Sequence, residues 1–119
     1  MKIRQGIKLL DEQLGTGAEV RPGYHVDYSL AMSLNKGEQI EWDVDGQKIT
    51  RLTIRGEVSR RSMINGVYYS CIGMRENGYR KVKIAPIWGY GDKAIEGWIP
   101  ANAVLIVEIW VNKIIRGNA

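Results

Sequence analysis

A chain of 119 residues, 45% of them hydrophobic, can bury one core, so we expect a single domain over residues 1–119. No segment approaches about 18 consecutive apolar residues, and residues 1–8 contain no apolar run of signal-peptide length, so we expect a cytoplasmic protein without a membrane partner. The formal net charge of +4 is spread along the chain, which is typical of a solvated surface and does not favour a nucleic-acid partner.

Alternating apolar and polar residues in the first half predict strands. The alternation is strict over residues 24–32, where Val26, Tyr28 and Leu30 share the apolar face. Shorter or less regular strands are expected over residues 7–10, 39–43 and 48–55. Clusters of Gly, Pro and Asn between these segments predict the turns that connect them.

Residues 62–74 have helical spacing. Met63, Val67, Cys71 and Met74 follow one another at steps of four, four and three, which gives one broad apolar face. Gly66 lies inside this segment, where glycine costs about 1 kcal/mol relative to alanine. A glycine in such a place indicates that another part of the chain comes close to the helix.

The second half adds two strands. The first, over residues 79–85, ends at Pro86, and the second, over residues 104–115, is apolar on both faces. A strand buried on both faces lies at the centre of its sheet. The whole pattern predicts an α+β fold, with an antiparallel sheet of five to six strands and one helix packed across it.

His25 and Cys71 are each the only residue of their kind. Zinc needs about four nitrogen or sulfur ligands, and a disulfide within the chain needs a second cysteine, so neither kind of site is expected. Cys71 falls in an apolar periodic segment, which favours an inert buried thiol. We therefore expect no metal and no cofactor.

Three blocks of sequence carry a family resemblance. The first, over residues 15–28, joins a glycine turn through Pro22-Gly23 to the Val26-Asp27-Tyr28 strand. The second is Met63-Ile64-Asn65-Gly66, and the third, over residues 73–109, contains Tyr90-Gly91 and Ile99-Pro100. In this order the blocks resemble the FKBP-type peptidyl-prolyl cis-trans isomerases. The likeness covers residues 7–114 and implies an FKBP-like sheet wrapped around one short helix.

The resemblance implies a pocket that grips a proline. The hydroxyl of the loop tyrosine matched by Tyr90 would bond a ligand carbonyl, and the backbone N–H of Ile64 would serve the same kind of ligand. Tyr90, Asp43 and Tyr28 are the expected catalytic residues. The expected substrate-binding residues are Trp42, Met63, Ile64, Val67, Ile95, Trp98, Ile99 and Val107.

The chain departs from the family at several pocket positions. The family's Phe-Asp pair matches Ile40-Glu41 by spacing or Trp42-Asp43 by residue type, and we favour the second. The chain has no Phe. The position of the family's second pocket Phe falls near Arg51 or Leu52. Val67 replaces the tryptophan of the pocket floor, and Val107 replaces a phenylalanine of its back wall. Fewer aromatic rings mean less contact area for a ligand.

The resemblance implies a peptidyl-prolyl isomerase that acts on proline-containing polypeptides, assists their folding and could bind macrolide inhibitors. We expect a monomer. Rotation about an X–Pro bond makes and breaks no bond to carbon, so it needs no nucleophile. A dry pocket that binds the twisted amide better than either planar form accelerates the rotation. The reduced aromatic wall leaves an alternative, a catalytically weak FKBP-like chaperone or adaptor that binds proline-containing or apolar segments.

Overall fold

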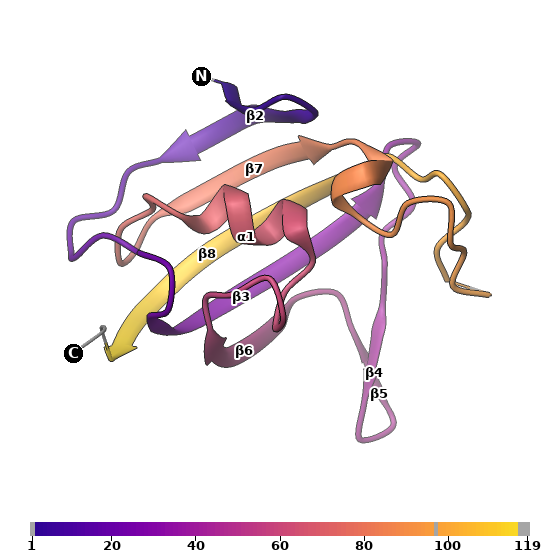
Figure 1. Ribbon diagram of the computed structural model, residues 1–119. Coiled ribbons are helices and arrows are strands. Elements are labelled where there is room, and N and C mark those ends of the chain that lie inside the picture. Colours follow the sequence, from indigo (N-terminus) through magenta and orange to yellow (C-terminus); the bar gives the residue numbers. More distant parts are fainter. Residues whose placement is uncertain (1, 97, 117–119) are drawn as a thin grey trace.

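The computed structural model describes residues 2–96 and 98–116, and within them the chain forms a large curved sheet, a short helix and a separate hairpin (Figure 1). The strands are β1 (Lys2–Arg4), β2 (Ile7–Gln13), β3 (His25–Leu34), β4 (Trp42–Val44), β5 (Gln47–Ile49), β6 (Leu52–Glu57), β7 (Tyr79–Ile84) and β8 (Leu105–Arg116). Helix α1 spans Asn65–Cys71, and the 3₁₀ turn η1 spans Pro86–Trp88. In the described residues the large sheet has six strands in the order β1-β2-β7-β8-β3-β6, and neighbouring strands are antiparallel.

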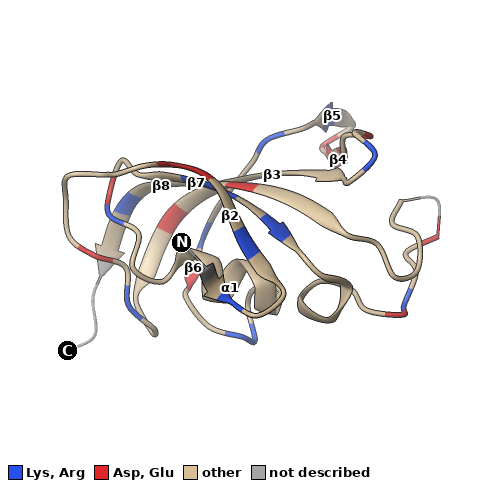
Figure 2. Ribbon diagram, turned by 90° about the horizontal axis from the view of Figure 1, so that it is seen from above, with Lys and Arg blue, Asp and Glu red and all other residues tan. Residues whose placement is uncertain are grey.

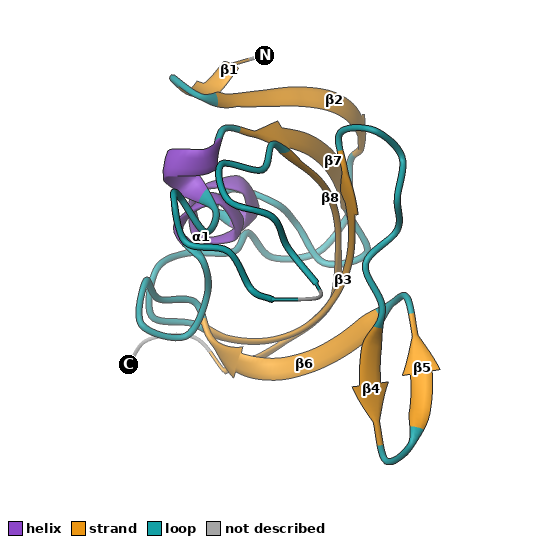
Figure 3. Ribbon diagram, turned by 90° about the vertical axis from the view of Figure 1, so that its right-hand side faces the viewer, coloured by secondary structure: helices purple, strands orange, loops and turns teal. Residues whose placement is uncertain are grey.

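The sheet curves around α1, so the core lies between the helix and the concave face of the sheet (Figure 3). Strand β8 lies inside the sheet, and Leu105, Val107 and Ile109 point to the core side and are fully buried. Strand β7 adds Val82 and Ile84, which are also fully buried. The predicted α+β fold, an antiparallel sheet around one short helix, is confirmed.

Helix α1 is shorter than the segment predicted over residues 62–74, because the residues on either side of it have extended backbone. The close approach expected at Gly66 is confirmed. A Cβ at this position would lie 2.7 Å from Ile84 Cδ1 and 2.9 Å from the Trp88 carbonyl oxygen. Within residues 2–96 and 98–116, no helix is long and apolar enough to cross a membrane.

The region between β3 and α1 differs from the prediction because the chain reverses more often than expected. Asp45 and Gly46 have positive φ values of 52° and 81°, and they connect β4 to β5 in a hairpin that projects from the large sheet (Figure 1). The chain then bends at residues 50–51, and β6 pairs with β3. The single strand predicted over residues 48–55 is therefore two strands with different partners.

Basic and acidic residues are interspersed along the strands and loops (Figure 2). Arg80 differs from most of them because its side chain is buried. Its guanidinium pairs with the Glu12 carboxylate at 2.7 Å and donates hydrogen bonds to the carbonyl oxygens of Ser70 and Ile72. The last carbonyls of a helix have no partner inside the helix, so Arg80 connects the end of α1 to β7 and β2.

Candidate functional site

A hollow of about 180 Å³ lies between β3, β6, the start of the β4–β5 hairpin and the start of α1. We call it the hollow. Its lining residues are Tyr28, Leu30, Met32, Trp42, Leu52, Ile54, Ser62, Met63, Ile64, Val67 and Tyr90. Clefts that hold drug-sized ligands measure about 300–1,000 Å³. The hollow is smaller and mainly apolar, which suits one small ring.

The alternation of β3 places one wall of the hollow. Tyr28, Leu30 and Met32 are two residues apart, so their side chains lie on one face of the strand. The register with β6 adds two more aliphatic residues, since Tyr28 pairs with Ile54 and Leu30 pairs with Leu52. One face of a two-strand ladder thus forms a continuous apolar surface beside the helix.

The start of α1 forms the opposite wall. Met63 and Ile64 directly precede the helix, and Val67 lies in its first turn. Val67 is only 1% exposed. The Ile64 carbonyl accepts hydrogen bonds from the N–H groups of Val67 and Tyr68. Within the described residues, the backbone N–H of Ile64 itself makes no hydrogen bond. This N–H is therefore available to a ligand.

Two tyrosines line the hollow, and each carries a hydroxyl without a partner among the described residues. Tyr28 is 3% exposed and Tyr90 is partly exposed, and neither hydroxyl bonds to another residue that the structure describes. Burial, and to a smaller degree the neighbouring Cys71, raises the pKa of Tyr28 to about 12. Burial also raises the pKa of Tyr90 above its ordinary value. Both hydroxyls stay protonated at neutral pH and can donate to a carbonyl oxygen.

An aromatic pair borders the hollow on the hairpin side. The ring of Trp42 packs edge-on against the ring of Trp98, with 6.2 Å between centroids and 76° between planes. The Trp98 Nε1–H group donates to the Glu41 carbonyl oxygen at 2.8 Å. These contacts hold the β4–β5 hairpin against the loop that follows Tyr90, and they fix the position of Trp42 at the hollow.

The structure brings six of the predicted site residues together. They are Tyr28, Trp42, Met63, Ile64, Val67 and Tyr90. The predicted pair Trp42-Asp43 is divided, because Trp42 lines the hollow while Asp43 is exposed and its carboxylate accepts a hydrogen bond from the Gly46 N–H at 3.0 Å. In this position Asp43 closes the hairpin turn and does not line the hollow.

Four predicted residues lie next to the hollow rather than in its lining. Ile95, Trp98 and Ile99 line a neighbouring groove on the other side of their loop. Val107 is fully buried in β8, where it pairs with Met32 of β3. It therefore lies beside a lining residue on the same face of the sheet.

Sequence reasoning missed several lining residues. Leu30 and Met32 share a face with Tyr28, so the alternation of β3 could have identified them. Ile54 lines the hollow because it pairs with Tyr28 in the β3–β6 register. The irregular alternation of its segment gave no signal of this pairing. Of the two positions considered for a second aromatic residue, Leu52 lines the hollow, whereas the Arg51 guanidinium lies over the Trp110 ring at 3.7 Å.

Comparison with known proteins agrees with this arrangement. Residues 17–112 match the family described as FKBP-type peptidyl-prolyl cis-trans isomerase. The chain belongs to the FKBP family. The resemblance found in the three sequence blocks is thereby confirmed, and the match covers every residue that lines the hollow.

Relatives of this FKBP chain differ in length, since one is much longer than the matched region and another is only slightly longer. FK506-binding protein 4 of Chaetomium thermophilum is 34% identical over 109 residues, which are 92% of this chain but 21% of that protein. The chain thus spans about a fifth of the length of that relative. FK506-binding protein 1A of Neurospora crassa is 33% identical over 104 residues, which are 87% of this chain and 83% of that protein.

Among solved structures, the crystal structure of AtFKBP13 has the same fold. Its TM-score is 0.71 at 22% sequence identity, and the match covers 92% of this chain and 94% of that chain. At this level of identity the likeness describes the fold, and the site is argued from this chain's own residues.

Proposed function

We propose that this FKBP domain is a peptidyl-prolyl cis-trans isomerase, which accelerates rotation about X–Pro bonds in polypeptides and so assists their folding. The observation that carries the proposal is the apolar hollow of about 180 Å³, whose lining includes two tyrosine hydroxyls and one backbone N–H that bond to no residue in the described part of the chain. A proline ring is small and apolar, and the carbonyl groups beside it need donors. The hollow supplies both requirements.

The proline ring would lie against Val67, Met63 and Met32, which are buried side chains without charge. The Tyr90 hydroxyl and the Ile64 N–H would donate to the carbonyl groups that flank the ring. Tyr28 would add a third donor from β3. Trp42 would cover the side that faces the hairpin, so that little water reaches the amide.

The rate enhancement would come from solvation rather than from a chemical intermediate. The barrier to rotation is about 18–20 kcal/mol because twisting the amide destroys its resonance. A planar amide is more polar than a twisted one, so removing water costs the planar form more free energy. Donors that fit the twisted form add to this difference, and each ~1.36 kcal/mol of preference is about tenfold in rate.

We propose unfolded proline-containing polypeptides as the substrates and macrolides of the FK506 type as further ligands. Two relatives carry the name FK506-binding protein, which supports the second part. We also propose that the chain acts as a monomeric single domain in the cytoplasm. The one cysteine is buried and free, which fits a reducing compartment.

A protease-coupled assay on an X–Pro tetrapeptide tests the proposal. We expect micromolar protein to accelerate cis-to-trans conversion well above the rate in buffer. Tyr90→Phe should retain the fold by circular dichroism and lose part of the acceleration. Binding of the peptide with no acceleration would contradict the enzymatic proposal and favour the alternative of an adaptor that only binds.

A further inference from the structure

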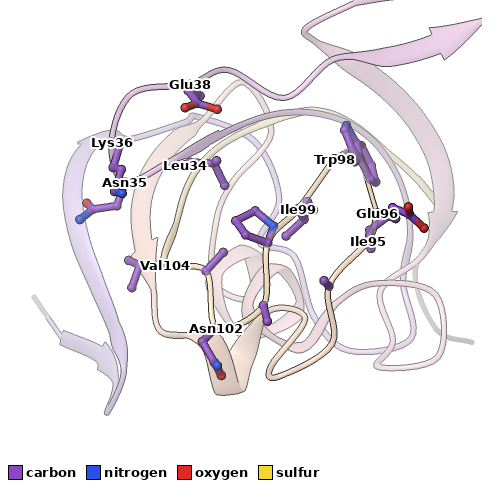
Figure 4. A pocket seen from close by; sticks show the side chains of 14 residues that line it. Leu34, Asn35, Lys36, Glu38, Ile95, Glu96, Trp98, Ile99, Asn102 and Val104 are labelled. Atoms are coloured by element: carbon purple, nitrogen blue, oxygen red, sulfur yellow. The ribbon is translucent and has the colours of Figure 1, made fainter.

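Two surface cavities larger than the hollow differ in the charges that line them. A groove of about 730 Å³ between the turn after β3 and residues 98–104 is lined by one lysine and two glutamates, so it has no excess of positive charge (Figure 4). The other cavity measures about 480 Å³, and its charged residues are Arg60, Arg61 and Glu57. Two arginines and one glutamate favour a negatively charged ligand in this second cavity.

We call the second cavity the arginine pocket. It lies between the Pro22-Gly23 turn, the end of β6 with the turn that follows it, and the Tyr68-Tyr69 side of α1. Its volume is within the range of about 300–1,000 Å³ that ligand clefts occupy. None of the described residues that line it also lines the hollow, so the two sites are separate.

The turn after β6 holds both arginines in place. The Ser62 N–H donates to the Ser59 carbonyl oxygen, and the hydroxyls of the two serines bond at 3.0 Å. These bonds close the chain on either side of Arg60 and Arg61. The Arg60 guanidinium also donates to the Tyr69 hydroxyl at 3.1 Å. Donors that are positioned before a ligand arrives lower the entropy cost of binding.

The positive charge around the pocket is only partly balanced. Arg61 lies 3.6 Å from the Glu57 carboxylate, and its side chain is 89% exposed. Arg60 pairs with no carboxylate in the described part of the chain. A third guanidinium, that of Arg4, lies over the Tyr69 ring at 4.1 Å. The hydrogen bond from Arg60 and, to a smaller degree, the charge of Arg4 lower the pKa of Tyr69 below its ordinary value, as expected in a positive potential.

The donors of the pocket suit a phosphate group. A guanidinium presents its N–H groups in a planar fork that matches two phosphate oxygens. The Tyr68 hydroxyl makes no hydrogen bond to another residue that the structure describes, so it can add a donor. One phosphate group would fill only part of about 480 Å³, which leaves room for the side chain that carries it.

Nucleic acid fits the pocket less well. Proteins bind single strands by stacking bases on exposed aromatic rings. The Tyr69 ring is covered by Arg4 and packs edge-on against Tyr68 and Trp88, with 5.0 and 5.4 Å between ring centroids. A phosphorylated peptide needs no free aromatic face, so these contacts do not hinder it.

We infer that the arginine pocket binds a phosphorylated side chain of a partner polypeptide. Arg60 and Arg61 are exposed, so the pocket lies at the surface, where such a partner reaches it. The inference does not depend on the proposed isomerase function, because the hollow takes no part in the binding.

Fluorescence anisotropy of a labelled peptide tests the inference. The peptide contains glycine, alanine and one phosphotyrosine, and it lacks proline so that the hollow is not engaged. It should bind at least about tenfold more tightly than its unphosphorylated form. Arg60→Gln and Arg61→Gln should each weaken binding of the phosphorylated peptide about tenfold, the effect of losing a hydrogen bond to a charged group. Arg60→Lys should restore only part of the affinity, because it keeps the charge but loses the fork.

Lys36→Gln is the matched control, because it removes the same charge from an exposed residue at the groove, outside the arginine pocket (Figure 4). It should keep the affinity of the wild type. Equal affinities of the wild type for the two peptides would overturn the inference. A loss in Lys36→Gln as large as in the two arginine variants would also overturn it, since attraction to the net charge would then explain the binding.

Competition experiments separate the possible sources of the phosphate. Inorganic phosphate should displace the labelled peptide only at concentrations well above those of the unlabelled phosphopeptide, and displacement at equal concentrations would contradict a polypeptide ligand. An oligothymidine that binds more tightly than the peptide, and loses affinity in Arg60→Gln, would overturn the inference in favour of nucleic acid. In ¹⁵N spectra the phosphopeptide should shift the signals of residues 57–61, 68 and 69. Shifts confined to residues of the hollow would contradict the assignment to the arginine pocket.

Discussion

At the scale of single residues, Tyr28 and Tyr90 determine what the hollow can bind. Their hydroxyls have no partner among the described residues. A ligand carbonyl would accept a hydrogen bond from either of them. The hollow should therefore distinguish a proline flanked by peptide groups from a purely apolar ring of the same size.

Tyr90→Phe should weaken binding of an X–Pro peptide by about twofold to tenfold, because one hydrogen bond to the ligand contributes about 0.5–1.5 kcal/mol. Its effect on the free energy of unfolding should be below about 0.5 kcal/mol, since the hydroxyl bonds to none of the residues that the structure describes. Calorimetric titration and urea unfolding measure the two quantities. Unchanged affinity would remove Tyr90 from the site.

The activity should be independent of pH between about pH 6 and 9, because the lining residues include no carboxylate and no histidine. Stability should behave differently at high pH. Since the pKa of Tyr28 is raised to about 12 in the folded state, its contribution is complete below about pH 10 and is lost as the pH rises from 10 to 12.

Urea unfolding at several alkaline pH values measures this loss. The Tyr28→Phe variant should lose less stability than the wild type above pH 10, because it has no phenol to ionise. Equal losses in the two proteins would show that Tyr28 does not carry the effect.

The family pattern predicted part of the lining of the hollow. Tyr28 and Trp42 were identified because the family pattern marks them, and both line the hollow. Asp43 shows the limit of such matching. Its residue type fits the pattern, but the hairpin turn gives its carboxylate a local partner in the Gly46 N–H. Sequence spacing could not reveal that the chain reverses at this point.

At the scale of elements, Trp98 contributes two contacts that position the β4–β5 hairpin. The hairpin pairs only with itself in the described residues, and Trp98 holds it through the Trp42 ring and the Glu41 carbonyl. The hairpin supplies Trp42 to the hollow. Its mobility should therefore affect activity more than it affects global stability.

Trp98→Phe tests this link. It removes the hydrogen bond to Glu41 and part of the ring contact, each of which contributes about 0.5–1.5 kcal/mol. We expect faster hydrogen exchange in β4 and β5, a severalfold lower kcat/KM, and a melting temperature that falls by only a few degrees. Unchanged exchange in the hairpin would show that Trp98 does not hold it.

Elements with regular alternation or a long apolar run were the ones that the sequence identified well. Residues 24–32, 79–85 and 104–115 were predicted as strands and correspond to β3, β7 and β8. Strand β1 (Lys2–Arg4) was not predicted, because three residues are too few to show a period. The boundary between β5 and β6 depends on which strands they pair with. The local sequence pattern does not reveal these partners.

At the scale of the whole molecule, Arg80 connects parts of the chain that are distant in sequence. Its bonds reach Glu12 in β2 and the carbonyls of Ser70 and Ile72 at the end of α1. Loss of this side chain would leave two helix carbonyls and one carboxylate without their donor. The helix that forms one wall of the hollow would then be less firmly attached to the sheet.

Arg80→Met should lower the free energy of unfolding by about 3 kcal/mol, toward the lower end of the range for breaking a buried pair, because Glu12 remains partly exposed. Glu12→Gln should cost less, since its amide oxygen can still accept a hydrogen bond from Arg80. Urea unfolding of the two variants measures both values. A larger loss for Glu12→Gln would contradict this account of the network.

The central claim is that the hollow receives the proline ring of a substrate. Nuclear Overhauser effects between the ring protons of a bound X–Pro peptide and ¹³C-labelled methyl groups of Val67 and Met63 measure this most directly. We predict strong effects at both residues, together with exchange between the cis and trans forms that is faster than in buffer. Faster exchange with ring contacts only to residues outside the hollow, or no contact at all, would contradict the claim.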